Sequence, residues 1–307
     1  MSTTVTDKAA VIQPNKSASQ ALADGDHRIA DATFEQQPLV VIEPTKGWSS
    51  INLGDIWRYR ELLYFLAWRD VKVRYKQTVL GIVWVILQPL ASTIIFTIIL
   101  GKLARVPTNG IPYPILVYAG LLPWTFFSNA VSGAAVSLVS NSYLVTKIFF
   151  PRMIIPISGV GGRLLDFAIA FVILIGMMIY YHVPLTRNLL MLPVLITMLV
   201  LLTLGFALLS GALNVKYRDI SVVLPVLIQL GMFVSPVLYS TTLVPPRWRS
   251  IYSLNPLVGI IDGFRASLIA QPFNWQAIGI SAVFSIALLT LSAYVFRAVE
   301  RGFADIV

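Results

Sequence analysis

The distribution of charged residues is the feature that most limits how this chain can fold. Six stretches of at least 20 residues contain no Asp, Glu, Lys or Arg. A helix of roughly 20 residues crosses a hydrocarbon core about 30 Å thick, so each stretch is long enough to span a membrane. The stretches are Gln77–Gly101, Val106–Thr146, Phe167–Thr186, Asn188–Val215, Ile220–Pro246 and Ala266–Phe296.

The overall composition supports the same interpretation. Hydrophobic residues make up 57% of the chain and charged residues 12%, about half the charged share of a typical soluble protein. The apolar runs lack the alternation of barrel strands, and helices satisfy their own backbone groups in lipid. We therefore predict an all-α polytopic membrane protein with six transmembrane helices, at about Leu80–Leu103, Ile115–Val139, Ile157–Tyr181, Leu189–Leu213, Val222–Ser240 and Trp275–Phe296.

Four regions are predicted along the chain. Residues 1–50 are rich in Ser, Thr, Ala, Gln and Asp without a sustained apolar period, which predicts a disordered cytoplasmic tail. Residues 51–79 are interpreted as an N-terminal amphipathic interface helix and linker, with a cytoplasmic extension of the first span as the alternative. The six-helix transmembrane domain is expected at residues 80–301, and residues 302–307 are expected to be a cytoplasmic C-terminus.

The basic residues predict the orientation of the spans. Twelve of them lie in the predicted cytoplasmic loops, six of these between Arg58 and Lys76, against six in the outer loops. This bias places both termini of a six-span chain in the cytoplasm. Because the basic residues sit between spans and form no continuous stripe, we expect no nucleic-acid partner.

The connection Ser140–Pro156 is too short and too charged to be a span, and too apolar to be a solvated loop. It carries Lys147 and Arg152 among aromatic and aliphatic residues. A short apolar cytoplasmic helix that cannot bury itself alone indicates a docking element for another protein. A helix lying flat in the membrane interface is equally consistent with the pattern.

The outer segment Thr241–Phe273 contains four prolines and is nevertheless apolar. Within it, Leu257–Ala270 is expected to form a helix of about 14 residues, too short to cross the bilayer. Asp262 and Arg265 are spaced to pair on one face of that helix. The segment is interpreted as a re-entrant extracytoplasmic hairpin before the last span.

The chain offers little chemistry of its own. It has no cysteine, only two histidines and no G-x-x-x-x-G-K-[ST] loop, so we predict no catalytic residues, no metal site and no nucleotide site. Arg163 and Asp166 are the ionisable residues that come nearest to a span interior. Their i, i+3 spacing favours a structural ion pair over a proton-coupling site.

Aromatic residues in or beside the spans suggest a wall for a long, weakly charged sugar chain, because aromatic rings stack on the apolar faces of sugars. For any single residue, an aromatic belt or lipid-facing filler is the competing interpretation. Small residues at four-residue spacing, such as Ala130 and Ala134, predict close packing of the second span. The predicted substrate-channel residues are Trp84, Tyr118, Trp124, Phe126, Phe127, Phe233 and Tyr239.

Several stretches together resemble one family, the transmembrane permease subunits of ABC exporters for O-antigen polysaccharide, of the Wzm type. Permeases for capsule and teichoic acid are close to it. The resemblance covers about residues 50–307. The stretches are ELLYFLAWRDVKVRYKQTVLGIVWVILQPL (Glu61–Leu90), NSYLVTKIFFPRMIIPI (Asn141–Ile157), NVKYRDI (Asn214–Ile220), SPVLYS (Ser235–Ser240) and LNPLVGIIDGFR (Leu254–Arg265).

The resemblance implies a channel formed by two copies of the chain in the lipid of a bacterial inner (plasma) membrane. A separate ATP-binding-cassette ATPase subunit would bind ATP and Mg, this chain would hold no cofactor, and lipid-linked polysaccharide would be the cargo. The implied ATPase-docking residues are Asn141, Tyr143, Leu144, Lys147, Ile148, Phe149, Lys216, Tyr217, Arg218 and Asp219. The implied exit-hairpin residues are Trp248, Tyr252, Asp262 and Arg265.

Three alternatives remain. The cargo of such a permease could be capsular polysaccharide or teichoic acid. A membrane-embedded enzyme acting on lipid-linked glycans would need a paired acid and base, for which only Asp166, Asp262 and His182 are candidates. An ion-coupled secondary transporter would depend on Asp166.

Overall fold

The computed structural model describes residues 53–76, 81–105, 111–184 and 186–300, and every regular element within these ranges is a helix. This confirms the predicted all-α class for that part of the chain. The predicted tail at residues 1–50 and the C-terminus at 302–307 lie outside the described residues.

Five helical segments are long and apolar enough to cross a membrane. They agree with five of the six predicted spans to within a few residues at most ends. Two of them are composite, since a π-helical turn continues one and a 3-10 turn opens another. They are α4 (Gly81–Phe96) with η1 (Thr97–Leu103), α5 (Tyr113–Ser140), α7 (Ile154–Tyr180), η2 (Arg187–Met191) with α8 (Leu192–Lys216), and α12 (Trp275–Glu300).

The predicted fifth span is shorter than expected. Helix α9 (Ile220–Val234) has 15 residues and therefore rises only about 22 Å, whereas the prediction extended to Ser240. The helix ends because Ser235 precedes Pro236, and a residue before proline is driven out of the helical region. Ser235 accordingly has extended backbone angles (φ −104°, ψ 154°).

The remaining helices are short. Helix α11 agrees with the helix predicted at Leu257–Ala270, and the positions of these helices relative to a membrane remain predictions. Their bounds are α2 (Leu53–Arg58), α3 (Arg60–Lys76), α6 (Ser142–Lys147), η3 (Thr241–Leu243), α10 (Pro246–Tyr252) and α11 (Pro256–Leu268).

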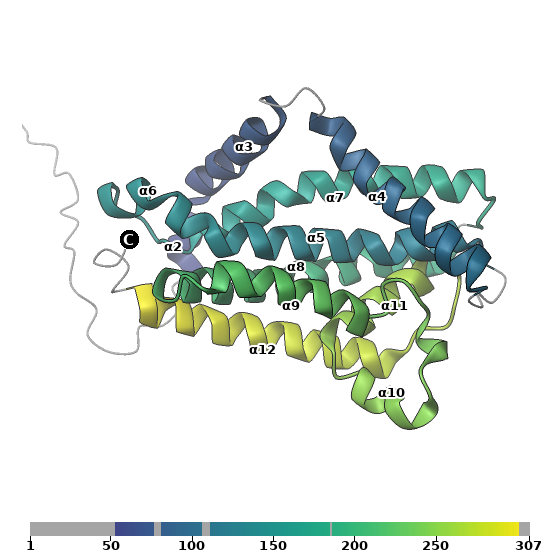
Figure 1. Cartoon of the computed structure of the whole chain (residues 1–307). Coiled ribbons are helices and arrows are strands. Elements are labelled where there is room, and N and C mark those ends of the chain that lie inside the picture. Colours follow the sequence, from purple (N-terminus) through teal and green to yellow (C-terminus); the bar gives the residue numbers. More distant parts are fainter. Residues whose placement is uncertain (1–52, 77–80, 106–110, 185, 301–307) are drawn as a thin grey trace, which may run out of the picture. The chain divides into compact units, whose positions relative to one another are not determined.

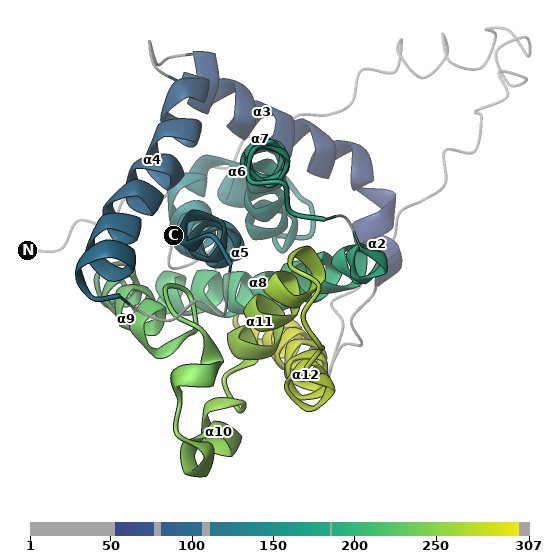
Figure 2. The same ribbon diagram turned by 90° about the vertical axis from the view of Figure 1, so that its right-hand side faces the viewer.

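Helix α5 is the central element of the bundle. It packs against α7 and α8, and the end-on view in Figure 2 shows it surrounded by other helices. Ala130 and Ala134 are almost fully buried, and a Cβ added at Gly211 of α8 would lie 3.3 Å from the Ala134 carbonyl oxygen. Small residues therefore permit the close α5–α8 contact, as predicted.

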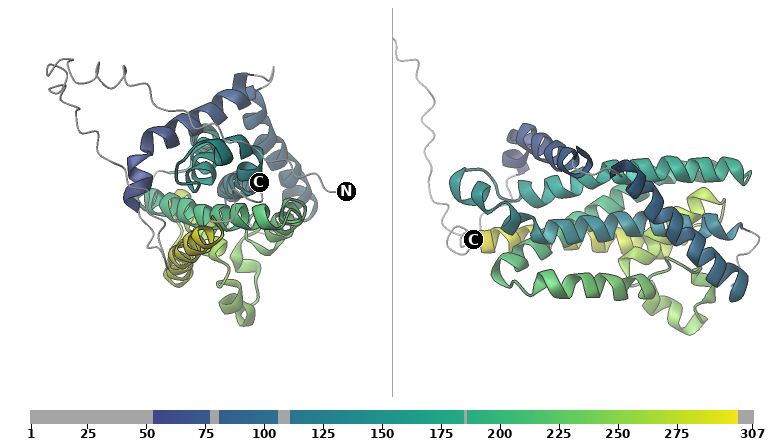
Figure 3. Two further views of the ribbon diagram at one scale, coloured as in Figure 1. Left: turned by 90° about the vertical axis from the view of Figure 1, so that its left-hand side faces the viewer. Right: turned by 45° about the horizontal axis from the view of Figure 1, so that its top comes forward.

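The two ends of the bundle carry different elements. Helices α3 and α6 lie toward one end, and α10 and α11 lie at the other (Figure 1). Figure 3 shows the α6 end from outside. At that end the start of α7 is fastened to the last turn of α12, because the Arg152 amide donates to Glu300 Oε1 at 2.9 Å and Arg152 Nη1 donates to the Glu300 carbonyl oxygen at 2.7 Å.

Candidate functional site

Helix α6 and the two residues that follow it present an apolar and basic surface at their end of the bundle. Tyr143 is 69% exposed, Phe149 is 79% exposed, and Ile148 and Lys147 are also open to the surroundings. The Lys147 ammonium lies 5.7 Å from the centre of the Tyr143 ring, within cation–π range. Four of the predicted docking residues therefore share one surface, and their contact with an ATPase remains a prediction.

A second exposed group adjoins the same end. Lys216, Tyr217, Arg218 and Asp219 occupy the link between α8 and α9, and all four are exposed. Val215, directly before them, belongs to the same buried cluster as Val145 of α6. The two stretches predicted to form the docking surface thus share one core at one end of the bundle.

Asn141 and Leu144 face inward instead. Leu144 packs against the buried cluster around Val145. The Asn141 side chain accepts a hydrogen bond from Arg69 Nη2 at 2.9 Å and donates to the Ser137 carbonyl oxygen at 2.8 Å. In the protomer, therefore, these two residues fix α6 to its neighbours.

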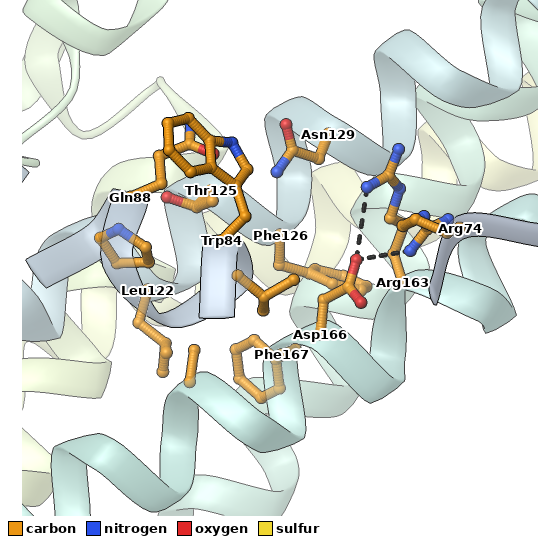
Figure 4. A pocket seen from close by; sticks show the side chains of 13 residues that line it. Arg74, Trp84, Gln88, Leu122, Thr125, Phe126, Asn129, Arg163, Asp166 and Phe167 are labelled. Atoms are coloured by element: carbon orange, nitrogen blue, oxygen red, sulfur yellow. Dashed lines mark hydrogen bonds and ion pairs between the residues drawn. The ribbon is translucent and has the colours of Figure 1, made fainter. Parts of the chain in front are cut away.

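A pocket of about 310 Å³ lies between α3, α4, α5 and α7. Its polar end is formed by Arg74, Arg163 and Asp166, and Figure 4 shows these side chains grouped on one side of the pocket. Its other walls are mainly apolar, with two neutral amide side chains, one hydroxyl and one indole among them. These other lining residues are Trp84, Val85, Gln88, Pro89, Leu122, Thr125, Phe126, Asn129, Phe167 and Ala170.

Asp166 is the centre of the charged group. Its Oδ2 accepts from Arg74 at 2.6 Å and from Arg163 at 3.3 Å, and its Oδ1 accepts from the Tyr75 hydroxyl. Burial and the hydrogen bond to Asp166 raise the pKa of Tyr75, so the phenol keeps its proton and remains a donor. The predicted Arg163–Asp166 ion pair is confirmed, and two residues of α3 extend it.

The predicted channel residues do not form one surface in the protomer. Trp84, which is 57% exposed, and Phe126 line the pocket. Tyr118, Trp124 and Phe127 are buried in the main core: the Tyr118 hydroxyl donates to the Ala170 carbonyl oxygen at 3.0 Å, and the Phe127 ring meets the Phe206 ring edge-on at 5.4 Å.

Phe233 and Tyr239 belong to a different region. Phe233 is exposed on α9, and the Tyr239 hydroxyl donates to the Phe233 carbonyl oxygen at 3.0 Å. The Tyr239 and Tyr252 hydroxyl oxygens are also 3.0 Å apart. The channel role of all seven residues remains a prediction.

Arg265 anchors the outer segment to the rest of the bundle. Its guanidinium is buried and donates to three backbone carbonyl oxygens, at Leu116 (Nε, 3.1 Å), Tyr239 (Nη1, 2.7 Å) and Val237 (Nη2, 2.5 Å). Asp262 Oδ1 lies 3.9 Å from Nη1, so the predicted pair exists but is the looser interaction. Arg265 therefore connects α11 to the start of α5 and to the turn after α9.

The other predicted exit residues differ in how close they lie to Arg265. Burial raises the pKa of Asp262, an effect that the Arg265 guanidinium partly offsets. Tyr252 is half-buried beside Tyr239, whereas Trp248 is 51% exposed on α10. Among the described residues, no group of three or more His, Cys, Asp and Glu could hold a metal ion.

The sequence did not predict the role of Arg74 and Tyr75. Both lie in the basic stretch before the first span, where their spacing gives no indication of a partner 91 or 92 residues away. No local pattern could have identified these contacts, because Arg163 at i, i+3 already balances the charge of Asp166.

Comparison with known proteins gives a consistent result. The family model described as ABC-2 type transporter matches residues 61–269. The O-antigen export system permease protein RfbA of Klebsiella pneumoniae is 28% identical over 256 residues, covering 83% of this chain and 97% of that protein. The protein of the same name from Myxococcus xanthus is 28% identical (82% and 97%), and the polysialic acid transport protein KpsM of Escherichia coli is 25% identical (76% and 92%).

Proposed function

Because this chain belongs to the ABC-2 type transporter family, we propose that it is the membrane-spanning permease subunit of an ATP-driven exporter of lipid-linked O-antigen polysaccharide. One observation carries the choice of cargo. The alignment with two O-antigen export permeases covers 97% of the length of each. ATP and Mg would be bound by a separate ATPase subunit, and the permease itself would catalyse no reaction.

The surface formed by Tyr143, Lys147, Ile148 and Phe149 together with Lys216–Asp219 is the proposed contact with that ATPase. An exposed apolar patch with a basic rim is typical of a protein-binding site. The α6 helix is connected to α3 through Asn141 and Arg69, and α3 is connected to α7 through Arg74, Tyr75 and Asp166. A displacement of α6 would therefore be transmitted to the wall of the pocket.

The proposed topology has six spans, with α9 as the fifth and both termini in the cytoplasm of a bacterial inner membrane. In the proposed assembly two copies form the channel. This accounts for the exposed surface of α9. Its side chains are almost all apolar, and none of its residues is buried in the protomer. A second copy or lipid would cover them.

A second cargo has some support of its own. The relative named for polysialic acid transport aligns over 92% of its own length, which makes another polysaccharide, such as a capsular polymer, the alternative cargo. Its alignment covers 76% of this chain against 83% for the O-antigen relative, and for this reason we place O-antigen first.

The proposed function is tested by deleting the gene in the source bacterium. Lipid-linked O-antigen should then accumulate in the cytoplasm while synthesis continues, and its surface display should be lost until the gene is restored. The purified chain alone should hydrolyse no ATP. Normal surface display in the deletion strain would contradict the proposal, and polymer accumulating on the outer face without ligation would instead favour the membrane-enzyme alternative.

A further inference from the structure

The pocket between α3, α4, α5 and α7 combines an excess positive charge with apolar walls. Arg74 and Arg163 bring two positive charges to the single carboxylate of Asp166, so the group carries a formal net charge of +1. These side chains are only partly exposed, at 27%, 27% and 15%. A charge of this kind in a partly dehydrated site attracts an anion more strongly than it would in water.

The polarity of the pocket changes along the helices. Helices α5 and α7 run antiparallel here, since Gly133 faces Arg163 and the Phe126 ring meets the Phe167 ring edge-on at 5.4 Å. Arg163, Asp166 and Asn129 therefore share one level. Leu122 and Ala170 lie deeper, on the side away from α6. One end of the pocket suits a charged group, and the other suits a hydrocarbon chain.

The position of α4 relates this polarity to the membrane. The helix starts at Gly81, inside the charge-free stretch Gln77–Gly101, and Trp84, about one turn later, lines the pocket. Arg74, seven residues before Gly81 in the chain, lines the same pocket as Trp84 and contacts Asp166 at 2.6 Å. The charged end of the pocket therefore lies near the level at which the apolar part of α4 begins, where the phosphates of a lipid leaflet and interfacial Trp residues are found.

We propose that this pocket binds the phosphate of a lipid, with the phosphate beside Arg74 and Arg163 and its apolar chain along Leu122, Phe126 and Phe167. Gln88, Thr125 and Asn129 would donate to oxygens next to the phosphate. Two sources share this chemistry: the phosphate that links the cargo to its lipid carrier, and an anionic phospholipid of the membrane. The first source rests on the proposed function, whereas the second does not.

Binding can be measured with the full-length chain in a phosphate-free maltoside detergent, by titration followed with native mass spectrometry. The probes are farnesyl diphosphate, farnesol and inorganic pyrophosphate. Farnesyl diphosphate should bind more tightly than farnesol, which lacks the phosphates, and than pyrophosphate, which lacks the chain. Equal binding of farnesol and farnesyl diphosphate would overturn the proposal.

Arg163→Gln should weaken farnesyl diphosphate binding about tenfold, because it removes a charged donor. The matched change Arg187→Gln, at an exposed arginine outside the pocket, should leave binding unchanged. Asp166→Asn raises the net positive charge of the group, so this variant should bind farnesyl diphosphate at least as tightly as the wild type does. Weaker binding by a monodisperse Asp166→Asn protein, or unchanged binding by Arg163→Gln, would contradict the proposal.

Dioleoylphosphatidylglycerol distinguishes the two sources. Displacement of farnesyl diphosphate by an equal amount of this lipid supports a site for membrane phospholipid, and resistance to displacement supports a site for the carrier phosphate. The binding result and the gene-deletion result are independent. Arginine-dependent binding with normal surface display in the deletion strain would support the site and contradict the export function. Loss of surface display without arginine-dependent binding would support the export function and contradict the site.

Discussion

Arg69 donates a hydrogen bond from Nη2 to Asn141 Oδ1 at 2.9 Å and so joins α3 to the residue between α5 and α6. The same Arg69 nitrogen lies 2.9 Å from Asp70 Oδ1. Asn141 in turn donates to the Ser137 carbonyl oxygen. This contact connects α3, through Arg69, to the residue at which the helix of the proposed docking surface begins.

If α6 transmits motion through this contact, Arg69→Ala should separate ATP hydrolysis from export. We expect ATPase binding and hydrolysis to persist while export falls severalfold, because the docking surface is intact and its connection to α3 is lost. The cost in folding free energy should be about 1 kcal/mol, that of a partly exposed hydrogen bond. Export and ATP hydrolysis measured on the same reconstituted complex test this, with Arg187→Ala as control. An unchanged ratio of the two rates would contradict it.

The docking surface should respond to charge and polarity. Lys147→Glu combined with Ile148→Asp places two carboxylates on an exposed apolar and basic surface. We expect weaker co-purification of the ATPase subunit, with little change in the melting temperature, because neither side chain is buried in the protomer. Arg187→Glu, which reverses the charge of an exposed arginine outside this surface, is the control. Full retention of the ATPase by the double variant would rule out this surface.

Trp84 and Trp124, both predicted from the sequence to line the channel, should respond differently to replacement by alanine. Trp124 is 5% exposed and its ring lies against Gly231 of α9, so Trp124→Ala should destabilise the protein by about 3–5 kcal/mol. Trp84 is mostly exposed in the pocket, so Trp84→Ala should cost less than about 1 kcal/mol and act mainly on export. Thermal unfolding in detergent and surface polysaccharide, measured for both variants, distinguish the two effects. Similar melting temperatures would show that Trp124 is not a core residue.

Gly120 leaves room for the hydrogen bond between the Arg265 guanidinium and the Val237 carbonyl oxygen. A Cβ at this position would overlap the Val237 carbonyl group and the Arg265 guanidinium, so Gly120→Ala should destabilise the protein by about 1–3 kcal/mol. Gly176, on α7, has no atom within 4 Å of an added Cβ, so Gly176→Ala should be neutral or slightly stabilising. Melting temperatures of the two variants provide the comparison. Equal effects of the two changes would mean that the turn after α9 can move away from α5.

Much of the fold follows from local signals. Hydrophobic runs located five spans and the short helix α11, because span length and helix length depend on residues close in sequence. The end of α9 was missed: the apolar run continues to Leu238, and only Pro236 marks the break. Proline within a span also occurs without a break, at Pro123 in α5, so composition alone could not decide.

The candidate site was less predictable because it depends on contacts distant in sequence. The Arg163–Asp166 pair has helical spacing and was predicted, whereas the partners of Asp166 on α3 were not. Likewise, sequence shows that Tyr118 and Trp84 are aromatic and near spans. Which helix face each occupies, and whether another helix covers that face, depends on packing between elements.

The shortness of α9 has a consequence for the lipid beside it. In the proposed topology this helix is about 8 Å shorter than the hydrocarbon core of a typical bilayer. Lipid in contact with its exposed apolar side must compress toward that length, since mismatch of this kind is relieved by local thinning of the bilayer. A thinner leaflet shortens the distance that a polar headgroup travels through hydrocarbon. The permease would then lower the free-energy barrier for a headgroup that crosses the membrane in two ways, by thinning the bilayer beside it and by forming a channel.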